Sequence, residues 1–91
     1  EGSCVEVSHI LKALSHPQRL MILGHLLEGS KTVGELVELC EISQSQMSQF
    51  LARMKTEGLV GCERNGRFQH YSVTDKRLVN LMKTIRKEYC G

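Results

Sequence analysis

The sequence predicts a small α+β domain, mostly helical, in which a helix-turn-helix is followed by a β-hairpin and a last helix. Apolar residues recur at helical spacing through most of the first 58 residues and again after residue 75. Between these segments, Asn65-Gly66 separates two short runs of strand-forming residues, which is typical of a two-residue hairpin. The 91 residues contain no Pro- or Ser-rich linker, so we expect a single domain over residues 1–91.

Two helices are expected before the helix-turn-helix. The first spans residues 4–14, and its apolar positions are Val7, Ile10, Leu11 and Leu14. The second begins at Pro17, because proline fits the first helical position and the residue before it favours extended geometry. Gly29 ends this helix. Its predicted core stripe consists of Leu20, Leu23, Leu26 and Leu27.

The helix-turn-helix is predicted from two helix starts and the short connection between them. Thr32 and Glu35 have the spacing of a capping box, which begins a short third helix. Ser43 and Gln46 repeat this spacing before a fourth helix, the recognition helix, expected over residues 44–57. Four apolar residues should anchor this helix, the first two as a hydrophobic staple: Ile42, Met47, Leu51 and Met54.

The chain then changes from helical to strand periodicity. A hairpin, the wing, is expected over residues 59–73 with Asn65-Gly66 at its tip. A last helix is expected over residues 75–89, capped by Thr74 or Asp75. The apolar residues that share one side of this helix are Leu78, Leu81, Met82, Ile85 and Tyr89.

The composition excludes several classes of protein. No secretory signal pattern and no apolar run of membrane-spanning length occur, so we expect a cytoplasmic protein with no membrane partner. No phosphate-binding glycine loop, Ser/His/Asp set or paired carboxylates are present, so we expect neither an enzyme nor a cofactor. Residues 59–91 carry seven basic and three acidic side chains, a sum of +4 that permits an anionic partner.

The polar side of the fourth helix suits double-stranded DNA. Its first two turns offer glutamine and serine with no charge before Arg53, whereas exposed helices usually carry lysine and glutamate. Glutamine pairs with adenine, serine donates or accepts, and arginine reads guanine or holds phosphate. Such a side could merely be solvated, but a basic-tipped hairpin directly after a helix-turn-helix favours DNA binding. The predicted DNA contacts are Gln44, Ser45, Ser48, Gln49, Arg53, Arg64 and Arg67.

Four motifs together resemble one known family. SHPQRLMIL, VGEL, SQSQMSQFLARMKTEGLV and ERNGRFQHYS follow one another as in the ArsR/SmtB family of winged-helix repressors, across nearly the whole chain. The resemblance implies a homodimer built from the first and last helices, with one recognition helix per protomer. It also implies a pseudo-palindromic operator, read by helices about 34–36 Å apart. Such repressors are usually released from DNA by a small-molecule inducer.

Two metal sites of this family do not match the sequence. The thiolate site has a CxC pattern at the start of the third helix, where this chain has Thr32-Val33-Gly34. The zinc site of the last helix needs histidine, and no histidine follows Asp75. We therefore expect no standard metal site. A repressor that binds a metal or metalloid through thiolates at other positions remains the alternative function.

The ending RKEYCG resembles the persulfide- and thiol-sensing branch of the family, typified by BigR and HlyU. That branch pairs the last-helix cysteine, here Cys90, with a second-helix cysteine, whereas this chain has Gly24 at that position. Cys4 is the first choice of replacement partner, and Cys40 the second. The expected inducer is then a reactive sulfur species or an oxidant. Cys40 and Cys62 are otherwise expected to be small hydrophobic residues.

Overall fold

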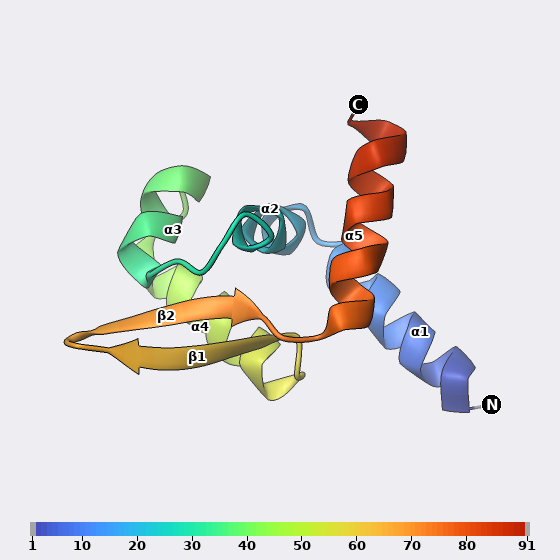
Figure 1. The fold of residues 1–91 in the computed structure, drawn as a ribbon, viewed down its shortest axis with the longest axis horizontal. Helices are drawn as coiled ribbons and strands as arrows, with labels where there is room; N and C mark the ends of the chain where they lie inside the picture. The colour runs from blue at the N-terminus through green and yellow to red at the C-terminus, as the bar shows by residue number, and fades with distance from the viewer. Residues whose placement is uncertain (1, 91) are drawn as a thin grey trace.

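The computed structural model describes residues 2–90, which form five helices and one two-stranded antiparallel sheet (Figure 1). This arrangement confirms the mostly helical α+β class. Among the described residues, no helix is long and apolar enough to cross a membrane. The elements are α1 (Gly2–Leu14), α2 (Pro17–Leu26), α3 (Val33–Cys40), α4 (Gln44–Thr56), β1 (Val60–Asn65), β2 (Phe68–Val73) and α5 (Lys76–Tyr89).

The elements divide into two groups on either side of α2. In Figure 1, α3, α4 and the β1–β2 wing lie on one side, and the wing projects away from the helices as a long arm. On the other side, the N-terminal half of α5 lies against α1, and the far ends of these two helices diverge. The wing tip is therefore far from the α1–α5 pair, whereas the end of α4 lies near α1 and β2 contacts α5.

The two predicted capping boxes have different outcomes. At α3, the Thr32 hydroxyl accepts a hydrogen bond from the Glu35 N–H at 3.2 Å, and the Glu35 carboxylate accepts one from the Thr32 N–H at 2.8 Å. At α4, the Ser43 hydroxyl accepts from the Gln46 N–H at 3.2 Å. The reciprocal bond is not formed, because the Gln46 side-chain oxygen instead accepts from the Ser43 hydroxyl at 3.3 Å. The second box is thus only half correct.

The predicted core stripe of α2 needs one correction. Leu23 and Leu26 are buried and Leu27 is half-buried, but Leu20 is 36% exposed. Ile22, which the spacing argument left out, is fully buried. α2 packs against α1, α3 and β2, so its buried side is wider than one stripe of leucines. Leu20 lies at the edge of that side.

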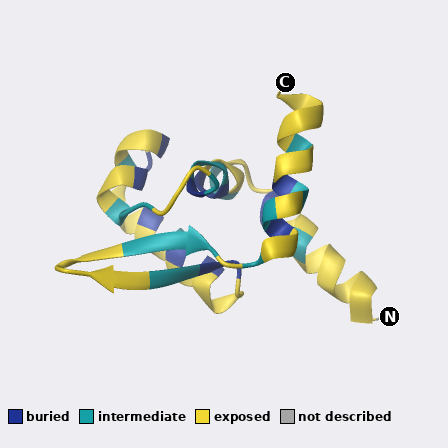
Figure 2. Cartoon of the chain, viewed as in Figure 1, coloured by how far each residue is buried: buried dark blue, intermediate teal, exposed yellow. Residues whose placement is uncertain are grey.

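The core holds the recognition helix from behind. Met47, Leu51 and Met54 are fully buried, as predicted, and Ile42 is 3% exposed. Figure 2 shows both buried and exposed residues along α4, which contacts α3 and β1. α4 ends at Thr56, and Gly58 turns the chain toward β1 with a φ of 81°, a conformation that favours glycine. The rigid anchoring fixes which side chains of α4 face outward.

Candidate nucleic-acid interface

The outward side of α4 consists of small neutral polar side chains. Ser45, Ser48 and Gln49 are exposed on the side opposite the buried methionines and Leu51, and Gln44, one turn before Met47, is exposed at the margin of this side. We call these four residues the reading face. Because none of them hydrogen-bonds to another element within residues 2–90, their donors and acceptors face solvent. A rigid helix that presents such groups has the chemistry needed to read base edges in a major groove.

Arg53 lies one helical turn after Gln49, at the edge of the reading face. Its side chain is 75% exposed, but its Nε lies 3.7 Å from a carboxylate oxygen of Glu57. A DNA phosphate would have to compete with Glu57 for this guanidinium. Arg53 is therefore an exposed cation at the margin of the reading face that is already paired with a carboxylate.

The wing carries its two arginines at the tip. Strands β1 and β2 pair from Val60–Val73 to Asn65–Phe68, and Gly66 has a φ of 66° in the turn. Arg64 and Arg67 are exposed, and the Arg64 Nε donates to the Gly66 carbonyl at 3.4 Å. The hairpin thus forms as the sequence predicts and presents two cations away from the core.

The wing tip and the start of α3 border the same shallow hollow. Arg64, Arg67 and Phe68 line it from the wing, and Thr32 and Gly34 line it from α3. Phe68, which the sequence analysis did not single out, is 57% exposed. The signal in the sequence that could have identified Phe68 was its position directly after Arg67, beside the tip of the wing. Together these residues join the wing tip to the start of α3 in one candidate surface.

The wing is attached to the helix-turn-helix by a short β-bridge. The Lys31 N–H donates to the Tyr71 carbonyl at 3.0 Å, and the Tyr71 N–H donates to the Lys31 carbonyl at 2.8 Å. The residue before the Thr32 cap is thereby fixed to β2. No sequence pattern marks this contact, because a single bridging residue has no periodicity.

Two contacts between the α2 and α4 regions fix the orientation of the recognition helix. Arg19, whose side chain is only 12% exposed, forms an ion pair with Glu57 just after α4. The ring of His16, the N-cap of α2, packs edge-on against Phe50 with centroids 5.3 Å apart. These contacts hold α4 near both its middle and its end. Local spacing does not predict this ion pair, because 38 residues separate its partners.

The four cysteines are free thiols in different surroundings. Cys40 is 5% exposed, and burial raises the pKa of its thiol, which disfavours the reactive thiolate. Cys62 is half-buried and pairs across the wing with Tyr71; burial first, and then the neighbouring thiol, raise the pKa of that tyrosine. Cys4 and Cys90 are exposed. Their helix ends point away from each other in Figure 1, so one protomer does not bring these two thiols together.

Residues 2–90 contain no group of three or more histidine, cysteine, aspartate and glutamate side chains arranged to hold a metal ion. At the position of the missing second-helix cysteine, the Gly24 carbonyl accepts a hydrogen bond from Arg86 of α5 at 3.0 Å. Position 24 therefore faces the last helix. A side chain at position 24 would therefore meet Arg86 where α2 and α5 approach each other.

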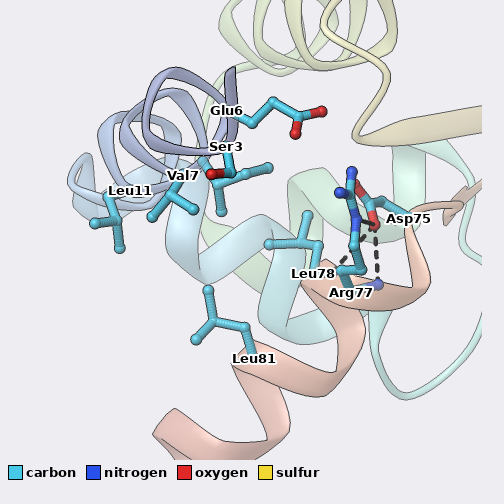
Figure 3. Close-up of a pocket in the computed structure, with 9 residues that line it drawn as sticks. Ser3, Glu6, Val7, Leu11, Asp75, Arg77, Leu78 and Leu81 are labelled. Atoms are coloured by element: carbon cyan, nitrogen blue, oxygen red, sulfur yellow. Dashed lines mark hydrogen bonds and ion pairs between the residues drawn. The ribbon is translucent and has the colours of Figure 1, made fainter. Parts of the chain in front are cut away.

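An apolar hollow of about 210 Å³ lies between α1 and α5 (Figure 3). Val7 and Leu11 are 55% and 54% exposed beside it, although a leucine or valine usually gains stability from burial. Asp75 and Arg77 form an ion pair at its rim. Burial tends to raise the pKa of Asp75, but hydrogen bonds from Arg77 and Leu78 hold it below its usual value. We call the apolar surface formed by Val7, Ile10, Leu11, Leu78 and Leu81 the α1–α5 face.

Three comparisons place these features among known proteins. Residues 16–61 match the family described as "Bacterial regulatory protein, arsR family". The transcriptional regulator YgaV of Escherichia coli is 37% identical over 92 residues, covering 99% of this chain and 92% of its own. The crystal structure of the transcriptional repressor BigR from Xylella fastidiosa superposes with a TM-score of 0.89 at 35% identity, covering 97% of this chain and 90% of its own.

For a third similar protein, Mb0332 from Mycobacterium bovis, the oligomeric state is also given. Its solution structure is that of a homodimeric winged helix-turn-helix DNA-binding domain. It superposes with a TM-score of 0.83 at 26% identity, covering 93% of this chain and 79% of that domain.

Proposed function

Because the chain belongs to the ArsR family of bacterial regulatory proteins, we propose that it is a homodimeric repressor that reads a pseudo-palindromic operator. One observation carries the DNA-binding part of this proposal. The reading face of α4 presents uncharged polar side chains opposite a buried anchor, and the wing that follows α4 carries two exposed arginines at its tip. Selection of a preferred duplex from random DNA tests the proposal.

The proposed contacts divide into base-reading and backbone-holding residues. Ser45, Ser48 and Gln49 lie near the middle of the reading face and would meet base edges in the major groove, with Gln44 at its margin. Arg53 would hold an adjacent phosphate. Arg64 and Arg67 would contact phosphates or a minor groove at the wing, which supplies the salt-dependent part of the affinity.

The homodimer would form through the α1–α5 face. Half-exposed valine and leucine side chains there would gain burial against a second copy, which a 91-residue chain with a small core needs. Two-fold symmetry would bury the same face of both protomers. It would also place two reading faces about 34–36 Å apart, one helical turn of DNA.

Release from DNA is proposed to follow oxidation of Cys90 with Cys4. An organic persulfide RSSH would pass its outer sulfur to the Cys90 thiol and leave as RSH. The Cys4 thiol would then attack the Cys90 sulfur, forming a disulfide and releasing H₂S. Both thiols are exposed, as this exchange requires, whereas Cys40 is buried and has a raised pKa.

Because the two helix ends diverge within one protomer, the proposed bridge joins two protomers. Treatment with a persulfide donor should therefore give a covalent dimer on a non-reducing gel and weaken DNA binding. Cys90→Ser and Cys4→Ser should each abolish both effects. Cys62→Ala, the matched control, should leave both intact. A response that survives in Cys90→Ser would rule out this switch.

A further inference from the structure

A second polar site lies between α1, α2 and the end of α4. It is a hollow of about 370 Å³, and we call it the basic hollow. Its polar lining residues are His9, Lys12, Arg19, Arg53 and Glu57. None of the reading-face residues lines it, and neither do the wing arginines. The hollow borders the interface only through Arg53, at the edge of the reading face.

The charge of the basic hollow does not follow from the local composition. Lys12 and Arg19 are the only lysine or arginine residues among the first 30, where the formal charge sums to −1. Folding nevertheless brings both of them to this one hollow and adds Arg53 from α4. Three permanent cations then surround one carboxylate, which leaves a formal excess of +2.

Glu57 cannot satisfy all of these cations. Its two carboxylate oxygens are already engaged, one with Arg19 and the other with Arg53 at 3.7 Å. Within residues 2–90, Lys12 forms no ion pair. The Arg19 Nε is buried and has no hydrogen-bond partner among the described residues. A buried donor without a partner costs free energy, so Arg19 keeps hydrogen-bonding capacity that Glu57 does not satisfy.

We propose that the basic hollow binds a phosphate group. Phosphate supplies the missing acceptor oxygens and the negative charge, and arginine binds it with directed N–H donors. Two sources share this chemistry: a backbone phosphate of DNA bound by α4, and free phosphate or a small phosphate ester. Since Glu57 caps α4, a phosphate that draws Arg53 or Arg19 away from it also adjusts the end of the recognition helix. The DNA source rests on the proposed function, whereas the free source does not.

Free phosphate is tested first by thermal unfolding in sodium phosphate against sodium chloride at matched ionic strength. Phosphate should raise the melting temperature of the wild type by roughly 3 °C or more. Lys12→Gln should lose most of this rise, because it removes one of the cations of the basic hollow. Lys12 is exposed, so the substitution should leave the core intact. Lys83→Gln removes the same charge from an exposed position on α5 and should retain it.

The DNA source is tested by the salt dependence of binding to a selected duplex. If Lys12 holds a backbone phosphate, Lys12→Gln should reduce the slope of log affinity against log salt by roughly 0.9 per protomer. Lys83→Gln should leave the slope unchanged. A change in either assay supports the phosphate site and identifies its source.

The proposal is overturned if both assays give the same result for Lys12→Gln and Lys83→Gln. Failure of the proposed function has a different signature, because the wild type would then bind no duplex preferentially while the thermal assay still reports on phosphate.

Discussion

Replacing Leu11 with glutamate is expected to convert the protein from a dimer to a monomer. Leu11 is 54% exposed in one protomer, so the substitution should leave the fold intact. In a symmetric dimer it occurs twice, and each copy loses about 2 kcal/mol of apolar burial before any cost of burying charge. The dimer dissociation constant should therefore rise about a thousandfold, as measured by analytical ultracentrifugation.

Leu39→Glu provides the matched control, because Leu39 is 47% exposed on α3, away from the α1–α5 face. It should remain dimeric. DNA affinity should fall with dimerisation in Leu11→Glu, since two linked half-sites bind more tightly than two separate protomers. If Leu11→Glu stays dimeric at the same concentrations as the wild type, the α1–α5 face is not the interface.

The second large effect is expected from Ser48→Glu on the reading face. Ser48 is exposed, so glutamate should not disturb the buried side of α4. In the major groove, however, a carboxylate would face the phosphates on both sides and displace a group suited to base edges. We expect affinity for the selected duplex to fall roughly 100-fold or more, about 3 kcal/mol, in a fluorescence-anisotropy titration.

Thr84→Glu controls for net charge, because it adds the same carboxylate at an exposed position on α5. Its affinity should change less than threefold, and both variants should keep the wild-type circular dichroism spectrum. Equal losses in the two variants would mean that overall charge, rather than the reading face, governs binding.

Local signals in the sequence were sufficient to predict the fold. The capping residues, the buried stripe of α4 and the Asn-Gly turn depend on neighbours within a few residues, so their spacing is visible in the chain. The wrong prediction that Leu20 belongs to the core also comes from relying on local spacing. Spacing predicts that a helix has an apolar side, but the direction of that side depends on which elements pack around it.

Contacts between distant residues could not be predicted in this way. The Arg19–Glu57 ion pair and the Lys31–Tyr71 bridge join segments that share no local pattern, and both position the candidate interface. The basic hollow was missed for the same reason, because its cations come from three helices. The geometry of the cysteines also changes their interpretation. Cys4 and Cys90 stay the proposed sensing pair, but as a link between protomers.

The central claim is that two reading faces, related by a two-fold axis, recognise one operator. Selection of bound duplexes from a random pool, followed by footprinting, tests this directly. We expect an enriched pseudo-palindrome with half-site centres about 10 base pairs apart, and protection of the major groove in both halves. Enrichment of no sequence, or of a single half-site bound by one protomer, would contradict it.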